Sequence, residues 1–341
     1  MKFFRFIVFL ILLMSPITAF SSEEAFKELD TYVERRLEFM AKKQASIDRL
    51  KDELRHAARA EQQLVVIDKL FEAYYTFRFD SAMVYVNRGL ALAESVKNAD
   101  FIANFRIHRG LLLATSGYYS QAEAVLQSVA PQTLPPHLLF KYYYSLSWLY
   151  NFWSAYCDDR EFAPRFRQLR YDYLCQALQY TPKGGAMYNY LLGEALFYRN
   201  EQQHAIDSYK RVLKQVGIDD RLYASAAYAI ARGYKLMGRM DLYEHYIAQA
   251  GISDQVCPLK ENLALQELSL YLYEQDPENS GRAVKYIYCS MEDAQFYNNR
   301  LRMLEISRIL PKVVQAYQDQ LNKRTNMLRW GLGCVLSLIH I

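Results

Sequence analysis

The side chains best suited to catalysis or metal binding are scattered along this chain. The six histidines are His56, His108, His137, His204, His245 and His340. They show neither the His-x-x-x-His spacing nor the His-Glu pairing that brings metal ligands together. The Gly-x-Ser-x-Gly pattern of a nucleophilic serine and the glycine-rich phosphate loop are absent from the sequence as well. We therefore expect no catalytic residues, no metal site and no cofactor, and we predict that the chain is not an enzyme.

The cysteines are an odd and widely spaced set. They are Cys157, Cys175, Cys257, Cys289 and Cys334. No Cys-x-x-Cys occurs, which removes the main signal of a zinc site or a thioredoxin-like redox site. In an oxidising compartment two of the first four can form a disulfide, and free buried thiols are the alternative that we favour. The acidic run Asp158, Asp159 and Glu161 lacks the spaced ligands of a calcium loop, so we interpret it as a solvated loop.

Residues 1–21 have the three-part pattern of a secretory signal. Lys2 and Arg5 give a positive start, and an unbroken apolar run follows. Ala19 and Ser21 then place small side chains at the positions that signal peptidase reads. An uncleaved anchor is the alternative, but the run is short against the ~20 residues of a membrane span. We predict a signal peptide, export of the mature chain and a periplasmic location.

Composition predicts a folded chain that does not bind nucleic acid. Hydrophobic residues make up 52% of the chain, and glycine and proline number only 13 and 9. Such a chain has enough apolar surface to fold, in contrast with a disordered one. The net charge of +4 is too weak for a phosphate-binding surface, because such a surface needs clustered Lys and Arg.

Apolar residues follow helical spacing nearly throughout, and no stretch alternates as a half-buried strand does. Residues 22–62 are predicted to form one long N-terminal helix with an apolar residue at every seventh position. These positions are Phe26, Val33, Met40, Ile47 and Leu54. Arg36 and Lys43 fall on the same seam, where a coiled coil needs apolar side chains. This pattern favours a helix that packs on the rest of the chain over a dimeric coiled coil.

Residues 63–297 contain repeated pairs of helices. In one unit Gly193 is followed by Ala205 and Tyr209, and other units have small residues at matching positions. The aligned anchors, spaced by about 40 residues or twice that, are Ala82, Ala122, Ala205, Tyr243 and Ala283. This order resembles the tetratricopeptide (TPR) signature, although that repeat is shorter and Tyr243 stands where a small residue belongs. The predicted fold class is all-α, with six helix pairs in a TPR-like superhelix, an α-solenoid.

Tyrosine is abundant, with 29 in the whole chain. For most of them we expect packing between helix pairs, with the hydroxyl reaching solvent. In the TPR pattern the first helix of each pair lines a concave groove. The residues that this pattern directs into the groove are Asn104, Tyr190, Glu194, Tyr198, Tyr228, Arg232 and Lys235. Tyrosines with mixed charges suit a peptide or protein partner, or a glycan stacked on the rings.

The end of the chain changes in character. Residues 298–326 are predicted to form a basic juxtamembrane helix, kinked at Pro311. Residues 327–335 are apolar and include Trp330, and they look like the start of a transmembrane helix that anchors the chain to the inner membrane. Residues 336–341 match the translation of a sequencing-adapter end. We interpret them as an artefact and expect the natural protein to continue.

Several stretches together resemble a Gram-negative bacterial family of TPR-containing membrane regulators. The stretches are Leu29 to Arg55, Tyr75 to Ala93 with Phe79-Asp80-Ser81-Ala82, and Ser290-Met291-Glu292-Asp293-Ala294 through Asn299-Arg300, Glu305 and Arg308. Members of that family have a periplasmic repeat region, one membrane helix, a cytoplasmic coiled coil and a helix-turn-helix-like region. The resemblance implies the ligand- or protein-binding sensor region of a single-pass transcription regulator, without its output region. A passive periplasmic scaffold that recruits envelope proteins is the alternative.

Overall fold

The computed structural model describes residues 22–261, 263–276 and 280–339. The predicted signal peptide lies outside these residues, as do the last two residues of the predicted artefact. Within the described ranges the secondary structure consists of α-helices and one short 3-10 helix, η1 (Pro131–Thr133). This confirms the predicted all-α fold class.

The N-terminal segment forms two helices where the sequence predicted one over residues 22–62. The first is α2 (Ser22–Glu34) and the second is α3 (Arg36–His56). The backbone leaves helical geometry at Arg35, which has φ −87° and ψ 6°. The apolar seam explains the break, because its two halves enter different cores. Phe26 and Val33 lie in the core of the C-terminal repeats, whereas Ile47 and Leu54 lie in the core of the first repeats.

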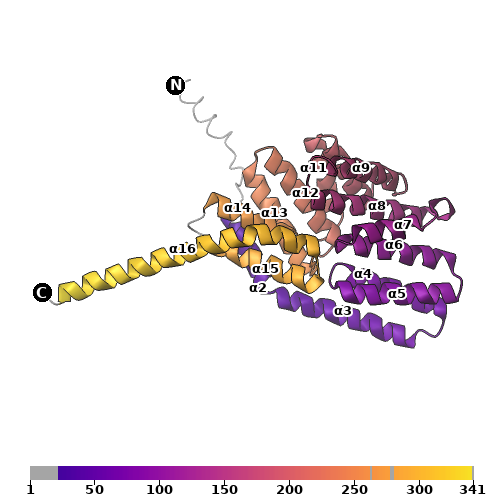
Figure 1. The fold of residues 1–341 in the computed structure, drawn as a ribbon, viewed down its shortest axis with the longest axis horizontal. Helices are drawn as coiled ribbons and strands as arrows, with labels where there is room; N and C mark the ends of the chain where they lie inside the picture. Colours follow the sequence, from indigo (N-terminus) through magenta and orange to yellow (C-terminus); the bar gives the residue numbers. More distant parts are fainter. Residues whose placement is uncertain (1–21, 262, 277–279, 340–341) are drawn as a thin grey trace, which may run out of the picture.

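Six consecutive pairs of helices follow, and they confirm the predicted helical-repeat solenoid (Figure 1). The pairs are α4 (Ala60–Tyr75) with α5 (Phe79–Ser95), α6 (Ala99–Thr115) with α7 (Tyr119–Gln127), α8 (Pro136–Cys157) with α9 (Ala163–Gln179), α10 (Ala186–Tyr198) with α11 (Gln202–Leu213), α12 (Arg221–Leu236) with α13 (Met240–Val256), and α14 (Ala264–Gln275) with α15 (Gly281–Tyr297).

Small residues allow the helices of a pair to approach closely. Four of the predicted anchors are fully buried, with 0% of their surface exposed: Ala82, Ala122, Ala205 and Ala283. Gly193 of α10 has the same effect, because a Cβ at this position would lie 2.5 Å from a ring carbon of Tyr209 in α11. Tyr243 is also fully buried and meets the ring of Tyr271 edge-on, at 4.9 Å between ring centroids. The larger side chain is therefore accommodated inside the core.

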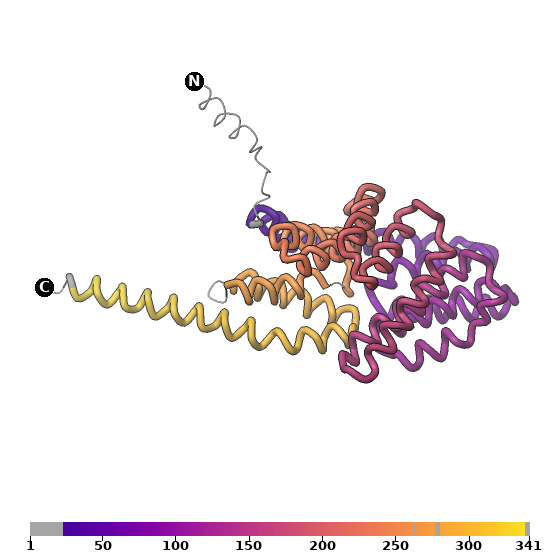
Figure 2. The backbone as a smooth tube through the Cα atoms, turned by 90° about the horizontal axis from the view of Figure 1, so that it is seen from above, coloured from indigo at the N-terminus to yellow at the C-terminus, as the bar shows by residue number. Residues whose placement is uncertain are grey.

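The two ends of the array are joined by α2. This helix packs on α13, where the fully buried Leu29 lies against Gly251. It also binds α15 through Asp30, which accepts hydrogen bonds from Arg282 at 2.9 Å and Lys285 at 3.4 Å. Figure 2 shows the N-terminal helix lying beside the C-terminal repeats. The superhelix is therefore closed on itself.

The turn of the first pair completes this closure. The hydroxyl of Tyr297, at the end of α15, donates to the backbone carbonyl of Tyr75 at 2.7 Å. The backbone N–H of Lys260, in the loop between α13 and α14, donates to the carbonyl of Thr76 at 2.9 Å. The side chain of Lys260 forms a buried ion pair with Asp293 of α15 at 2.6 Å. The first pair is thus hydrogen-bonded to the last.

The final helix, α16 (Arg300–Ile339), is continuous through Pro311, where the sequence predicted a juxtamembrane helix and a separate apolar segment. Its first half packs on α15 and buries Ile306 and Val313. Residues 321–337 are exposed, and this half projects away from the repeats (Figures 1 and 2). In the described part of the chain, no helix combines the length and the apolar character that crossing a membrane requires.

The close approach of α10 and α11 gives a test of the fold. Gly193→Val places a side chain against the Tyr209 ring, and we expect it to lower the free energy of unfolding by about 1–3 kcal/mol. Gly331→Val is the matched control, because a Cβ there has no neighbour within 4 Å. Urea unfolding followed by circular dichroism measures both. Equal stability of the two variants would contradict the packing described here.

Candidate binding site inside the closed array

The residues predicted to line a groove come from the first helix of three pairs. Asn104 lies on α6. Tyr190, Glu194 and Tyr198 lie on α10, and Tyr228, Arg232 and Lys235 lie on α12. Asn104 and Tyr190 are buried, with 5% of each exposed. Arg232 and Lys235 are exposed. The prediction that these residues bind a ligand stays a prediction, but their contacts show what else they do.

Asn104 belongs to a polar network that links the first helices of the first three pairs. Its amide donates to Asp68 of α4 at 2.6 Å and accepts from Lys141 of α8 at 2.9 Å. His108, one turn further along α6, lies 2.8 Å from the same carboxylate oxygen of Asp68. Because polar groups in a protein interior are costly unless they are hydrogen-bonded, this network fixes the register of three helices.

The carboxylate of Asp68 is held in its charged form. Burial opposes ionisation, but the hydrogen bond from His108 outweighs it, together with the charges of His108 and Lys141 and the amide of Asn104. The resulting pKa of Asp68 is lowered to about 2. The network therefore stabilises the fold wherever Asp68 is ionised.

Tyr190 and Glu194 of α10 lie where the groove is already filled. Glu194 forms an ion pair with Arg170 of α9 and accepts a hydrogen bond from Tyr209 at 2.6 Å. Tyr190 packs against the same Tyr209, with 5.9 Å between ring centroids. The pocket that Tyr190 and Glu194 line with Trp148 has a volume of ≈ 10 Å³. That is room for about one water molecule between these side chains.

The remaining predicted residues connect neighbouring helices. Tyr228 and Lys235 both bind Glu267 of α14, at 2.7 Å and 3.1 Å. Arg232 lies over the ring of Phe197, 5.1 Å from its centroid. Tyr198 stacks on Tyr171 at 4.3 Å, and its hydroxyl donates to Gln168 at 2.9 Å. Each of these four side chains has a partner on another helix.

A larger cavity lies at the closure of the array. Its volume is ≈ 400 Å³, and it is bounded by α3, the end of α4, the start of α12 and the segment that ends α13. The lining residues are Phe39, Lys42, Lys43, Glu72, Thr76, Asp219, Arg221, Val256, Cys257, Pro258 and Leu259. Because the two ends of the chain both contribute, this cavity exists only in the closed array.

Sequence analysis missed this cavity, although a signal was present. Lys43 interrupts the apolar seam of the N-terminal segment, and so does Arg36. Both positions turn out to face the closure. Arg36 pairs with Glu292 at 2.7 Å, whereas Lys43 lines the cavity. A cation on an otherwise apolar seam therefore indicated a polar contact between the two ends of the array. Sequence analysis had used it only as evidence against a coiled coil.

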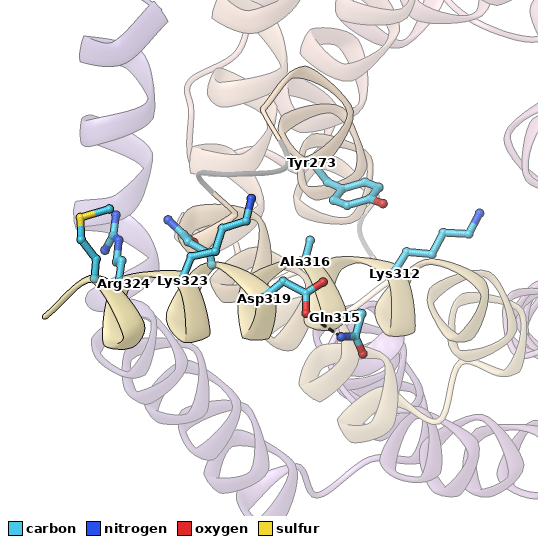
Figure 3. A pocket seen from close by; sticks show the side chains of 9 residues that line it. Tyr273, Lys312, Gln315, Ala316, Asp319, Lys323 and Arg324 are labelled. Carbon is cyan, nitrogen blue, oxygen red and sulfur yellow. Dashed lines mark hydrogen bonds between the residues drawn. The ribbon is translucent and has the colours of Figure 1, made fainter. Parts of the chain in front are cut away.

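A second cavity, of ≈ 540 Å³, lies between α14 and α16. Figure 3 shows Tyr273 of α14 pointing toward α16, while Lys323 and Arg324 extend from α16 on the same side. Asp319 is held by Gln315, which donates to it at 2.9 Å. The surface is mainly basic, and it lies where α16 begins to leave the repeats.

Besides the cavities, metal-binding side chains and cysteines are further candidates for a functional site. Among the described residues, no group of three His, Cys, Asp or Glu side chains is arranged to hold a metal ion. The five cysteines are free thiols; four of them are partly buried, where we expected buried thiols, and Cys334 is exposed. In the acidic loop, Asp159 accepts hydrogen bonds from the backbone N–H groups of Glu161 and Phe162 at 2.8 Å and 2.7 Å. It therefore shapes the turn into α9.

The closed array of helix pairs can now be compared with known families. A family model described as the SusR N-terminal TPR domain matches residues 33–308. The chain belongs to this family. The match runs from the end of α2 into the first turns of α16, so it includes all six pairs and the cavity. The search of curated proteins gives no match. TPR domains of this kind serve as binding scaffolds, typically without catalysis, and they generally mediate interactions between proteins.

The polar network gives a prediction with a defined pH range. Because the pKa of Asp68 falls to about 2 on folding, ionised Asp68 stabilises the protein above pH ~4, and this contribution disappears as the pH falls toward 2. Asp68→Asn is expected to lower the free energy of unfolding at pH 7 by about 2 kcal/mol and to flatten its decline between pH ~4 and ~2. Urea unfolding across this range measures the effect.

The control for this experiment is Asp80→Asn, which neutralises an exposed carboxylate at the start of α5. In this variant the free energy of unfolding should decline at acid pH as it does in the wild type. If the free energy of unfolding of Asp68→Asn declines as steeply as that of the control between pH ~4 and ~2, the network does not hold Asp68 in its charged form.

Proposed function

We propose that this chain is the periplasmic ligand- or protein-binding sensor region of a single-pass membrane regulator of transcription. In this proposal the repeats receive the signal, and α16 carries it toward the inner membrane. The family match supports a binding role, and the predicted signal peptide supports export. The observation that carries the proposal is that the base of α16 contacts both the early repeats and the last pair.

The base of α16 is part of the closure. Arg300, its first residue, donates a hydrogen bond to the hydroxyl of Tyr118 at 2.6 Å and lies 4.2 Å from the centre of that ring. Tyr118 belongs to the turn of the second pair, between α6 and α7. Leu301 is buried in the core of the second and third pairs, with 4% exposed. One helix therefore contacts both the early repeats and the last pair.

This seating gives a physical route for a signal. If a ligand binds one arrangement of the closure more tightly than another, it shifts the population between them. Any change in the distance between the second pair and α15 must then move the base of α16. Because residues 321–337 are exposed, the movement extends along the projecting half.

A passive periplasmic scaffold is the alternative, in which α16 serves only to hold the repeats near the membrane. A specific feature favours it: the side chains of the predicted groove already have partners on neighbouring helices, as Tyr228 and Lys235 bind Glu267. A rigid array presents a fixed surface to partner proteins. The two functions differ in whether the seating of α16 affects gene expression.

The seating of α16 gives a test in cells that carry the gene. Arg300→Ala removes the contacts with Tyr118, which are worth ~1 kcal/mol, so an equilibrium at the closure shifts about fivefold. We expect altered transcription of a restricted set of genes, measured by RNA sequencing at equal protein level. Arg308→Ala is the matched control, because Arg308 is an exposed arginine on the same helix. Wild-type transcription in both variants, and in a strain lacking the gene, would favour the scaffold.

A further inference from the structure

We propose that the cavity at the closure binds a small organic anion, whose carboxylate or phosphate group is held by Arg221 and Lys43. This inference rests on the proposed function, because it names the chemical class of the signal that the sensor receives. The volume of ≈ 400 Å³ lies within the ~300–1,000 Å³ that is usual for small-molecule sites.

Neither cation is paired. Arg221 lies over the ring of Tyr75, 5.1 Å from its centroid, but its guanidinium has no hydrogen bond or ion pair with any residue that the structure describes. Lys43 likewise has no such partner within the described ranges, and burial lowers the pKa of its amine. Other cations at the closure are paired, such as Lys260 with Asp293 and Arg36 with Glu292. Because partly buried charges are costly without a counter-charge, the two unpaired cations are suited to an anion from outside.

The acidic groups nearby do not take this role. Glu72 and Asp219 line the cavity, but neither lies within ion-pair distance of Arg221 or Lys43. Glu261 is also near Arg221, but burial raises the pKa of its carboxyl. Burial likewise raises the pKa of Asp254, near Lys260. A raised pKa shifts a carboxyl toward its neutral form, which repels a bound anion less than a carboxylate does.

The walls of the cavity indicate the shape of the ligand. A guanidinium presents a planar fork of N–H donors that matches a carboxylate or a phosphate. Phe39, Val256 and Leu259 add apolar surface, which suits a short carbon chain attached to the charged group. A molecule in this position contacts α3 and α4 together with α12 and α13. It would therefore bridge the two ends of the array and stabilise the closed form.

The test uses succinate and inorganic phosphate as anions, and succinamide as an uncharged analogue of succinate. Isothermal titration of the exported chain at low salt should detect binding of the anions but not of succinamide. Arg221→Gln should weaken binding by about 10- to 100-fold, because it removes charged hydrogen bonds. Lys43→Met should also weaken binding. Lys214→Met, at an exposed lysine after α11, should leave it unchanged.

Stability separates a binding role from a structural one. Without anion, Arg221→Gln should unfold close to the wild-type midpoint, since removal of an unpaired charge offsets the loss of its contact with the Tyr75 ring. The anions should raise the midpoint of the wild type but not that of the variant. The proposal is overturned if no anion binds, if the variants bind as the wild type does, or if Lys312→Met in the cavity along α16 abolishes binding instead.

The failure of this inference and the failure of the proposed function can be told apart. If anions fail to bind but Arg300→Ala still changes transcription, only the class of ligand is wrong. If anions bind at Arg221 but transcription is insensitive to Arg300, the site stands and the regulator proposal falls.

Discussion

The rest of the structure depends on the closure of the helical array by its own N-terminal helix. Helical repeats bury their faces against neighbours, so an open array leaves an unpartnered face at each end. Here α2 covers α13 and α15, and its Asp30 binds Arg282 and Lys285. The first pair then meets the last through Tyr75 and Tyr297. The cavity and the seat of α16 both result from this closure.

Tyrosine joins neighbouring helices throughout the array. Several buried rings fill the space between helix pairs, and their hydroxyls donate to carboxylates on neighbouring helices. The pairs are Tyr150 with Glu123, Tyr209 with Glu194, Tyr228 with Glu267 and Tyr271 with Glu244. A tyrosine combines a large apolar ring with one polar atom, so it packs between helices and binds a charge across them at once. The interior of the superhelix is therefore held by directional contacts as well as by apolar packing.

Local features of the sequence predicted the local features of the fold. Apolar spacing predicted helices, and the anchors Ala82, Ala122 and Ala205 predicted the pairs, because both reflect contacts between residues close in sequence. The closure joins residues more than 200 positions apart, as in the bond from Tyr297 to Tyr75, and no periodicity encodes such a contact. The break at Arg35 follows from that closure, since the two halves of the seam pack on opposite ends of the chain. The predicted groove residues were placed by family pattern alone. Their contacts with neighbouring helices, and the cavity beside Lys43, were therefore missed.

The chemistry of the closure makes it the place where a ligand can act. A ligand at a hundred times its dissociation constant contributes about 2.7 kcal/mol to the state that it binds. The apolar cores resist this, because displacing even one large buried side chain costs about as much. The closure is different: it combines apolar contacts, such as those of α2 and of Phe77 with Phe296, with hydrogen bonds and ion pairs. Each of these polar contacts is worth only about 1 kcal/mol net. A small ligand between the two ends is thus matched in energy to a few of these contacts. Arg300 and Leu301 attach α16 to the early pairs. A change in the contacts that close the array therefore also changes the position of α16.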